Sequence, residues 1–195
     1  MGSDGPRTHH ILLGGGIGAG KSSVARLFAE SGYLEIAADR VGVDVLRPGT
    51  EATVAVAREW PIVVSGGVVD RSALALIVFS DGDALRLLES ITHPAIVAEI
   101  DRRVAGTDRD VVVETPVRHL ELAGNWIRVA VVADEDTRIA RAVARGGDPD
   151  DVRRRVASQV RDEDWEDWAD VVVSNSGPWS ETQQMVLAMI KGLKA

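Results

Sequence analysis

Short apolar runs alternate along the chain with segments of helical periodicity. The apolar run Ile11–Leu13 has the length of a buried strand, and the residues after it place apolar side chains on one helical face, at Val24, Leu27 and Phe28. Similar apolar runs predict strands over residues 33–36, 111–114, 127–133 and 171–173. Because helical segments separate these runs, we expect an α/β fold of three layers, with a parallel five-stranded sheet between helices.

The stretch between the second and third predicted strands has a helical pattern throughout. It predicts helices over residues 52–60, 72–79, 83–90 and 94–104, with a turn at Ser65-Gly66-Gly67. A helical insertion of this length is typical of a substrate-binding subdomain. We therefore expect one domain, with a core over about 8–46, 108–135 and 170–195, a helical acceptor-binding part over 47–107 and a helical lid over 136–169.

Polar residues mark several expected helix boundaries. Asp39 follows the second strand and is predicted to cap the next helix. The segment Ser180-Glu-Thr-Gln183 has the pattern of a capping box, which would open the C-terminal helix. In the lid, Gly146-Gly147 is predicted to separate a helix over 136–145 from one over 149–160.

One segment carries a specific chemical signal. Residues 15–22 match the G-x-x-x-x-G-K-[ST] phosphate-binding loop, between a predicted strand and a predicted helix. The glycines let backbone N–H groups turn toward phosphate oxygens, and the helix N-terminus adds partial positive charge. We expect the loop to bind ATP through Gly15, Gly16, Ile17, Gly18, Ala19, Gly20, Lys21, Ser22 and Ser23. Within it, Lys21 would contact the β- and γ-phosphates and the Ser22 hydroxyl would be a Mg²⁺ ligand.

The use of lysine supports this interpretation. The chain has 22 lysines and arginines together, yet Lys21 is the only lysine before Lys191. A chain that otherwise uses arginine has thus kept lysine where a flexible point charge is needed rather than a planar fork. The alternative, a glycine-rich turn that only caps an ordinary helix, leaves the complete motif unexplained.

Composition and charge exclude several classes of protein. The chain has no cysteine, which rules out disulfides and thiolate zinc sites and is compatible with the cytoplasm, where we expect the protein. No apolar run has the length of a membrane span, and the first ten residues lack the apolar core of a signal peptide. A net charge of −8 argues against a nucleic-acid partner. We expect a monomer or a small homo-oligomer that acts on a small molecule.

Arginines gather in one part of this acidic chain. Seven of them lie between Arg138 and Arg161. Such a cluster suits a small phosphorylated ligand. It also suits a solvated helix face, because nearby aspartates can pair with it, and the two interpretations remain open.

Several polar residues stand at predicted strand or helix ends, where an α/β sheet gathers its ligands. Asp39 is a candidate base for an acceptor hydroxyl, a role that does not exclude helix capping. Glu114 ends the third strand and is a candidate for support of Mg²⁺. Arg141 and Arg145 share a helix face and are candidates to stabilise the transferring phosphoryl group. The segment Asn175-Ser176-Gly177 is either a contact to the nucleotide base or a plain turn.

These features occur in an order that resembles the dephospho-coenzyme A kinase family. The resemblance covers about residues 10–192. Beyond the general phosphate loop, it rests on an aspartate segment, a His-Pro pair, a lid motif, an Arg-Ile-Ala-x-Gln motif and a closing Asn-Ser-Gly. In this sequence these are Ala37–Asp39, His93-Pro94, Arg141–Gly147, Arg155–Gln159 and Ala169–Gly177.

The resemblance implies ATP-dependent phosphorylation of the ribose 3′-hydroxyl of dephospho-coenzyme A, with Mg²⁺ as cofactor. It implies that Asp39 is the base. It also implies a helical part that binds the acceptor. Apart from the resemblance, His93 is expected to contact substrate or cap a helix rather than bind a metal, because no second ligand lies at helical spacing. His93 is expected to open its helix. Pro116 and Arg118 follow Glu114 in a segment that lies beside the acceptor in the family.

The sequence departs from the family pattern at three places. The first aspartate of the Asp-Ala-Asp segment is Ala37, and Gly14 stands where the family usually has threonine. After Glu114, the family's Leu-Leu pair is replaced by Val117-Arg118, followed by His119. These changes leave two alternatives to the main hypothesis: a kinase for another, more anionic hydroxyl acceptor, or a nucleotide-binding regulatory protein without transfer activity.

Overall fold

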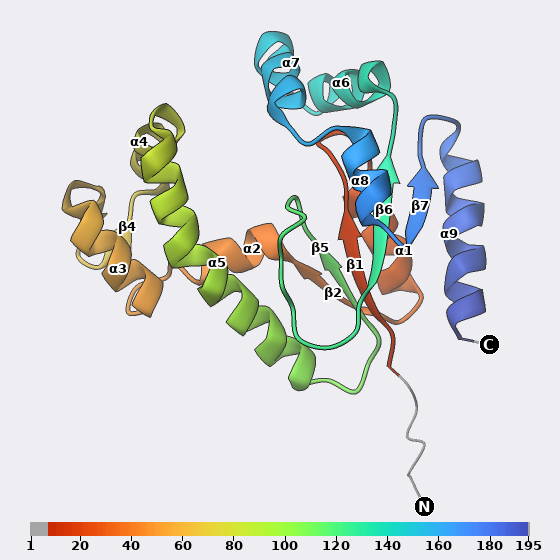
Figure 1. Ribbon diagram of the computed structural model, residues 1–195, viewed down its shortest axis with the longest axis horizontal. Helices are drawn as coiled ribbons and strands as arrows, with labels where there is room; N and C mark the ends of the chain where they lie inside the picture. Colours follow the sequence, from red (N-terminus) through yellow and green to blue (C-terminus); the bar gives the residue numbers. More distant parts are fainter. Residues whose placement is uncertain (1–7, 195) are drawn as a thin grey trace, which may run out of the picture. The chain divides into compact units, whose positions relative to one another are not determined.

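The computed structural model describes residues 8–194, which form two compact units (Figure 1). The first unit contains the described residues up to Ala37, together with Asp108–His119 and the chain from Ala123 onward. The second contains Ala38–Thr107 and Leu120–Leu122. The second unit thus begins at Ala38, nine residues before the start expected for the helical part at residue 47. Most of the N-terminal segment that lacks a signal-peptide core lies outside the described residues.

A five-stranded sheet forms the centre of the first unit, in the order β2-β5-β1-β6-β7. All neighbouring strands run parallel, as predicted. The strands are β1 (His10–Gly14), β2 (Leu34–Ala37), β5 (Val111–Glu114), β6 (Ile127–Val132) and β7 (Val171–Ser174). Each lies close to the apolar run that predicted it.

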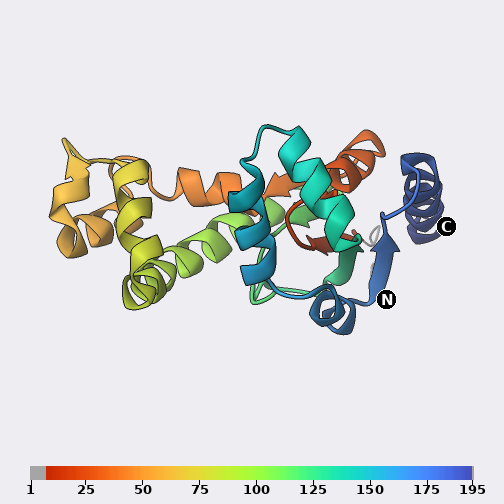
Figure 2. The same cartoon turned by 90° about the horizontal axis from the view of Figure 1, so that it is seen from above.

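Helices cover both faces of this sheet. On one face, α1 (Lys21–Glu30) and α9 (Trp179–Leu193) pack next to each other, as the view down the carboxyl ends of the strands shows (Figure 2). On the other face, α8 (Asp162–Trp168) packs on β6. The side chains of β6 alternate between these layers: Val129 and Val131 join the core under α1, whereas Ala130 joins the core under α8. The three-layer arrangement is confirmed.

The lid region consists of α6 (Glu135–Ala144) and α7 (Pro149–Ser158), and Figure 1 shows both beyond the carboxyl ends of the strands. They pack on each other through Ala142, Val152 and Val156. Gly146-Gly147 separates them as predicted, and the Asp148 carboxylate caps α7 by accepting hydrogen bonds from two backbone N–H groups. The helix α8 was not predicted, because it is short and its acidic sequence DEDWEDW has only two apolar residues, Trp165 and Trp168, to mark a helical face.

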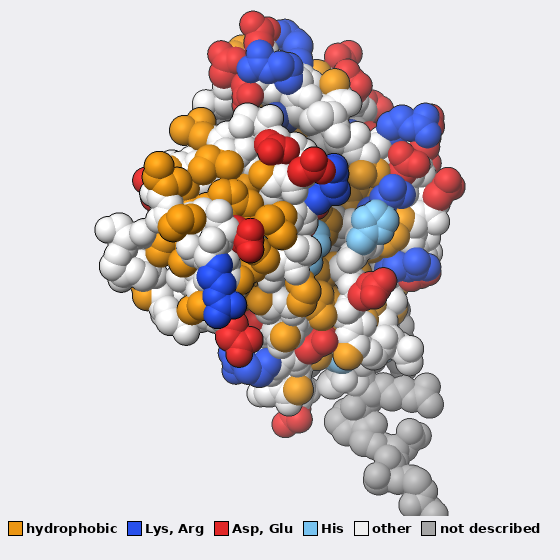
Figure 3. Space-filling model, turned by 60° about the vertical axis from the view of Figure 1, so that its left-hand side comes forward, with side chains coloured by type: hydrophobic (Ala, Val, Ile, Leu, Met, Phe, Trp, Pro, Cys, Tyr) orange, Lys and Arg blue, Asp and Glu red, His pale blue; other side chains and the backbone are white. Residues whose placement is uncertain are grey.

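The second unit is mostly helical. It contains α2 (Ala38–Asp44), α3 (Glu51–Glu59), η1 (Pro61–Val63), α4 (Arg71–Ser80) and α5 (Gly82–Ala105), and a hairpin of β3 (Val64–Ser65) and β4 (Val68–Val69). The predicted turn at Ser65–Gly67 joins the two strands of this hairpin. A small core gathers Val56, Val63, Val69, Leu74 and Val78. Large apolar side chains also remain exposed on this unit, and the space-filling view shows an extensive apolar surface (Figure 3).

Three predicted helix boundaries are wrong. The two helices expected on either side of His93-Pro94 are one helix, α5, because its packing against α2, α3 and α4 outweighs the backbone hydrogen bond that Pro94 cannot donate. His93 therefore lies inside a helix and does not open one. Asp39 lies within the first turn of α2, which begins at Ala38, so it is not the cap. The helix α9 begins at Trp179 with no side-chain cap, so Ser180 does not open a capping box.

No helix within residues 8–194 is long and apolar enough to cross a membrane.

Candidate active site

The phosphate loop connects the end of β1 to the start of α1, as the motif requires. Gly20 directly precedes α1 and has a φ of 103°, in the left-handed region that favours glycine. A β-carbon on Gly20 would also overlap the side-chain amide of Asn175. That amide donates a 2.7 Å hydrogen bond to the carbonyl oxygen of Ala19. The last part of the loop is therefore fixed by a side chain from the far end of the chain.

Lys21 lies at the start of α1, and its ammonium points back over the loop. Its Nζ donates hydrogen bonds to the carbonyl oxygens of Gly15 at 2.8 Å and Gly16 at 3.1 Å. The ammonium is thus held beside the loop. This is the position from which a lysine reaches the phosphates of a bound nucleotide.

Ser22 and Glu114 meet next to the loop. The Ser22 hydroxyl donates a 2.8 Å hydrogen bond to Oε1 of Glu114. Glu114 is the last residue of β5, which pairs with both β1 and β2. Both expected metal-site residues therefore present oxygen atoms at one place.

This pair suits Mg²⁺, which takes one or two protein oxygens and completes its shell with phosphate oxygens and water. Among the described residues there is no group of three or more histidine, cysteine, aspartate or glutamate side chains that would enclose a metal ion alone. An ion at this pair would need further oxygen ligands from phosphate or water.

Asp39 is exposed in the first turn of α2, in the helical unit. It follows β2 closely, and the last residue of that strand, Ala37, is the register partner of Glu114. Chain connectivity thus places Asp39 shortly after the carboxyl end of the strand next to β5. Its role as base remains a prediction.

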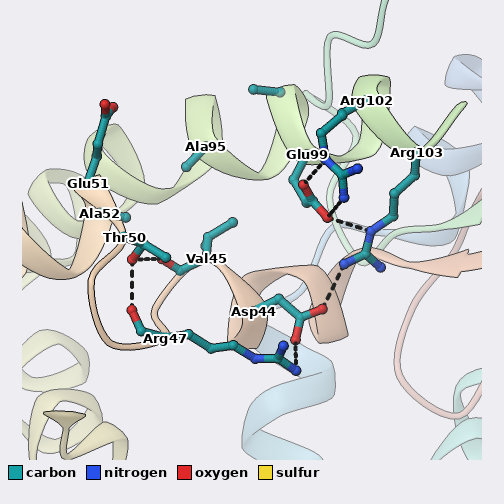
Figure 4. Close-up of a pocket in the computed structure, with 11 residues that line it drawn as sticks. Asp44, Val45, Arg47, Thr50, Glu51, Ala52, Ala95, Glu99, Arg102 and Arg103 are labelled. Atoms are coloured by element: carbon teal, nitrogen blue, oxygen red, sulfur yellow. Dashed lines mark hydrogen bonds and ion pairs between the residues drawn. The ribbon is translucent and has the colours of Figure 1, made fainter. Parts of the chain in front are cut away.

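An ion-pair network fixes the far end of α2 (Figure 4). Arg103 of α5 pairs with Asp44 at 2.8 Å and with Glu99 at 2.7 Å, and Arg102 pairs with Glu99 at 2.8 Å. Hydrogen bonds from these two arginines lower the pKa of Glu99 to about 2. The network joins α2, which carries Asp39, to the longest helix of the unit.

The network borders a cavity of about 450 Å³ within the helical unit (Figure 4). Arg47, which also pairs with Asp44, and Thr50 lie on its border, and Val45, Ala52, Ala95 and Ala98 add apolar surface. The lining therefore combines paired charges with small apolar side chains.

The lid arginines differ in their surroundings. Arg141 donates a 2.8 Å hydrogen bond from Nη1 to the carbonyl oxygen of Asn175, which ties α6 to the segment after β7. Arg145 ends the same helix, is exposed, and forms no ion pair with any residue in the described part of the chain. Arg141 thus has a position fixed by the fold, whereas Arg145 extends into solvent.

The rest of the arginine cluster is largely paired. Arg153 pairs with Asp150 and Arg154 with Asp151 along α7, each from an exposed position. Arg161 pairs with Glu163 and Asp164. These contacts favour the interpretation of a solvated, paired surface for those three arginines.

The segment after β7 is built into the protein. Asn175 is buried, and besides its bond to Ala19 its Oδ1 accepts a hydrogen bond from Thr182. The Ser176 hydroxyl accepts one from the backbone N–H of Asp134. The side chains of Asn175 and Ser176 therefore hold the loop and the start of α6 in place.

The departures from the family pattern also have internal partners. Arg118 donates a 2.9 Å hydrogen bond from Nη1 to the carbonyl oxygen of Asp164 in α8, while Pro116 and His119 are exposed. The indole of Trp165, the next residue of α8, is buried against Gly14, and a β-carbon on Gly14 would overlap it. The helix that sequence analysis missed thus contacts two of the unusual positions.

Residues 9–181 match the sequence profile of the family described as Dephospho-CoA kinase. The chain belongs to the dephospho-CoA kinase family. A Dephospho-CoA kinase of Leifsonia xyli is 38% identical over 195 residues, which span 94% of this chain and 98% of that one. A Dephospho-CoA kinase of Corynebacterium efficiens is 40% identical over 177 residues, 86% of this chain and 88% of that one.

Solved structures share the fold of this chain. The crystal structure of TT1252 from Thermus thermophilus has a TM-score of 0.80 at 27% identity, over 97% of this chain and 100% of that one. A Dephospho-CoA kinase from Campylobacter jejuni has a TM-score of 0.71 at 20% identity, over 96% and 98%, which supports the fold. The chain is therefore an ATP-dependent kinase that phosphorylates a hydroxyl group, and the predicted α/β phosphate-loop kinase fold is confirmed.

Proposed function

We propose that this protein transfers the γ-phosphoryl group of ATP to the ribose 3′-hydroxyl of dephospho-coenzyme A. The observation that carries the proposal is the pairing of Ser22 with Glu114 beside a complete phosphate loop, in a chain of the dephospho-CoA kinase family. The reaction forms a bond between the acceptor oxygen and the γ-phosphorus, breaks the bond to the β-γ bridging oxygen, and releases ADP and the acceptor's proton.

In this proposal the loop and Lys21 bind the β- and γ-phosphates. Backbone N–H groups from Gly18 to Ser23 supply donors, and the Lys21 ammonium moves from the carbonyl oxygens it now contacts to phosphate oxygens. Ser22 and Glu114 would hold Mg²⁺, which when bound neutralises charge on the β- and γ-phosphates. Positioning and charge stabilisation supply most of the catalysis in such reactions.

The acceptor hydroxyl needs a residue that orients it and accepts its proton. We assign this role to Asp39, which is exposed just after β2 and is held on a helix whose other end is fixed by Asp44. Arg141 and Arg145 would stabilise the transferring phosphoryl group, since both extend from α6. We assign Pro116, Arg118 and His93 to the surroundings of the acceptor.

The departures at Gly14 and Arg118 do not require a changed acceptor. Gly14 is explained by the indole of Trp165, which occupies the space that a larger side chain would need. Arg118 is at least partly explained by its bond to Asp164. Neither position requires a different substrate to account for it.

The test is ADP release from Mg·ATP, measured with and without dephospho-coenzyme A, for the wild-type chain and for Asp39→Asn. We expect acceptor-dependent turnover on the order of 1–100 s⁻¹ in the wild type. Asp39→Asn should lower kcat by about 10² or more while ATP affinity stays unchanged, because only proton acceptance is lost. Glu59→Gln, an exposed carboxylate of the same unit, is the control. Nucleotide binding without acceptor-dependent release would refute the proposed function.

A further inference from the structure

Arg138 is the one arginine that is buried among the described residues of the chain, with 4% of its surface exposed. It lies in α6 and belongs to the arginine cluster, whose other members at 153, 154 and 161 are exposed. A buried cation is unfavourable unless every donor finds a partner. Its partners therefore show what the residue does.

The guanidinium connects the phosphate loop to two other segments. Its Nε donates a 3.1 Å hydrogen bond to the carbonyl oxygen of Ile17, in the middle of the loop. Nη2 lies 3.3 Å from Oε1 of Gln159, and Nη1 forms a 2.8 Å ion pair with Asp162 at the start of α8. One side chain thus joins the loop, the end of the lid and the helix that follows it.

Gln159 completes the contact. Its Oε1 also accepts a 2.7 Å hydrogen bond from the backbone N–H of Ile17. Both main-chain polar groups of Ile17 are therefore bound by Arg138 and Gln159. The Ile17 side chain packs on the apolar core between α6 and α7 as well.

The glycines of the loop fit closely around Arg138. A β-carbon on Gly16 would overlap the guanidinium, and one on Gly18 would overlap the Arg138 carbonyl. A side chain at either position would therefore clash with α6. This is a second reason for glycine here, besides the close approach of phosphate to the loop backbone. The loop and Arg138 therefore fit together with no room for an added β-carbon at either glycine.

We propose that Arg138 is a positioning residue for ATP. Through Ile17 it holds the phosphate loop in the shape that binds the nucleotide, and the ion pair with Asp162 fixes the guanidinium in place. This inference rests on the proposed function only for the identity of the nucleotide, ATP. It concerns nucleotide binding and not the transfer step. Arginine suits the role better than lysine because its planar fork bonds three partners at once.

The inference predicts a selective effect on the nucleotide. Arg138→Gln should raise the Kd for Mg·ADP and the KM for ATP by about ten-fold or more, since a charge-assisted contact to the loop is lost. The KM for dephospho-coenzyme A should stay within about two-fold. Arg138→Lys, which keeps the charge and one hydrogen bond, should recover part of the affinity.

The experiment is calorimetric titration of Mg·ADP into full-length variants without acceptor, followed by steady-state kinetics with both substrates varied. Arg154→Gln, which removes an exposed arginine paired with Asp151 on α7, is the matched control and should bind like the wild type. Circular dichroism reports whether each variant is folded. Asp162→Asn, which changes a partner that is 28% exposed, should weaken nucleotide binding several-fold even if Arg138→Gln does not fold.

Two results would overturn the inference. One is a folded Arg138→Gln variant that binds Mg·ADP like the wild type; the other, where that variant does not fold, is unchanged binding by Asp162→Asn. Equal losses for ATP and for the acceptor would indicate a general structural role and would also count against it. Because binding is measured without acceptor, a wild-type protein that binds Mg·ADP but does not phosphorylate dephospho-coenzyme A would refute the proposed function and leave this inference standing.

Discussion

The Ser22 hydroxyl and the Glu114 carboxylate are joined by a 2.8 Å hydrogen bond between the start of α1 and the end of β5. The two residues are far apart in sequence, and the parallel pairing of β1 with β5 brings them together. Strand order thus places a carboxylate next to the loop residue that the motif assigns to Mg²⁺.

Glu114→Gln should weaken the use of Mg²⁺ without disturbing the fold. Glutamine still accepts the hydrogen bond from Ser22 but lacks the negative charge that favours the ion. We expect the Mg²⁺ concentration for half-maximal rate to rise about ten-fold or more at saturating ATP. Glu121→Gln, an exposed carboxylate nearby in sequence, is the control. An identical Mg²⁺ titration for Glu114→Gln and wild type would exclude Glu114 from the metal site.

Gly14 and Trp165 should be coupled in stability. Gly14→Thr, which restores the residue the family usually has, would place side-chain atoms where the indole lies, and overpacking of this kind costs about 1–3 kcal/mol. Trp165→Leu removes the nearer obstacle, although the Trp168 indole would still crowd the added atoms, and it leaves a cavity of its own. The double variant should therefore be more stable than the sum of the single changes indicates, by about 1 kcal/mol.

The measurement is urea unfolding of the two single variants, the double variant and the wild type. Gly147, whose added β-carbon would instead approach Val152 in the lid, provides a control. Gly147→Ala should show no coupling with Trp165→Leu. If the changes in the free energy of unfolding for Gly14→Thr and Trp165→Leu were strictly additive, the two side chains would not interact and the predicted coupling would be wrong.

Sequence alone was sufficient where a local pattern determines the structure. The strands around Ile11 and Val112 are short apolar runs, and the loop between β1 and α1 has a motif that depends on its own backbone. For the same reason the expected oxygen donors at Ser22 and Glu114 do lie together. Glu114 ends β5, and Ser22 lies in the first turn of α1, which follows the adjacent parallel strand β1.

Sequence was insufficient where partners come from distant segments. Arg138 belongs to a cluster for which the sequence left a phosphorylated ligand and a solvated face equally open, and only tertiary contacts with Ile17 and Asp162 show that it is buried. Trp165 lies in a short acidic segment where Trp168 is the one other apolar residue, which is too few to mark a helical face. At Pro94 the local rule predicted a break, but packing along the whole of α5 outweighs one missing hydrogen bond.

The network at Glu99 should make stability depend on acid pH. The pKa of Glu99 is lowered from 4.5 to about 2 by hydrogen bonds from Arg102 and Arg103, so the folded state binds this proton less readily than the unfolded state. The stabilisation is fully present above about pH 4.5 and decreases as the pH falls toward about 2. The contribution should be modest, because Arg102 is largely exposed.

The check is the free energy of unfolding of wild type and Glu99→Gln between pH 2 and pH 6. The difference between the two proteins should be largest near pH 6 and should shrink as the pH falls through this window. Glu59→Gln controls for the loss of an exposed carboxylate in the same unit. A difference that stays constant with pH would mean that the pairs with Arg102 and Arg103 do not stabilise the charged form of Glu99.

Arg145 offers the cleanest separation of catalysis from stability in the lid. It is exposed at the end of α6 and forms no ion pair within residues 8–194, so the folded protein loses little when it is removed. If it stabilises the transferring phosphoryl group, Arg145→Ala should lower kcat by roughly 10–10³ and change the free energy of unfolding by less than about 0.5 kcal/mol. Arg141→Ala should also lower stability, because its bond to Asn175 is lost.

Arg153→Ala, exposed and paired with Asp150, is the control and should leave kcat unchanged. Wild-type kcat in Arg145→Ala would remove that residue from the reaction and leave Arg141 as the lid arginine to test.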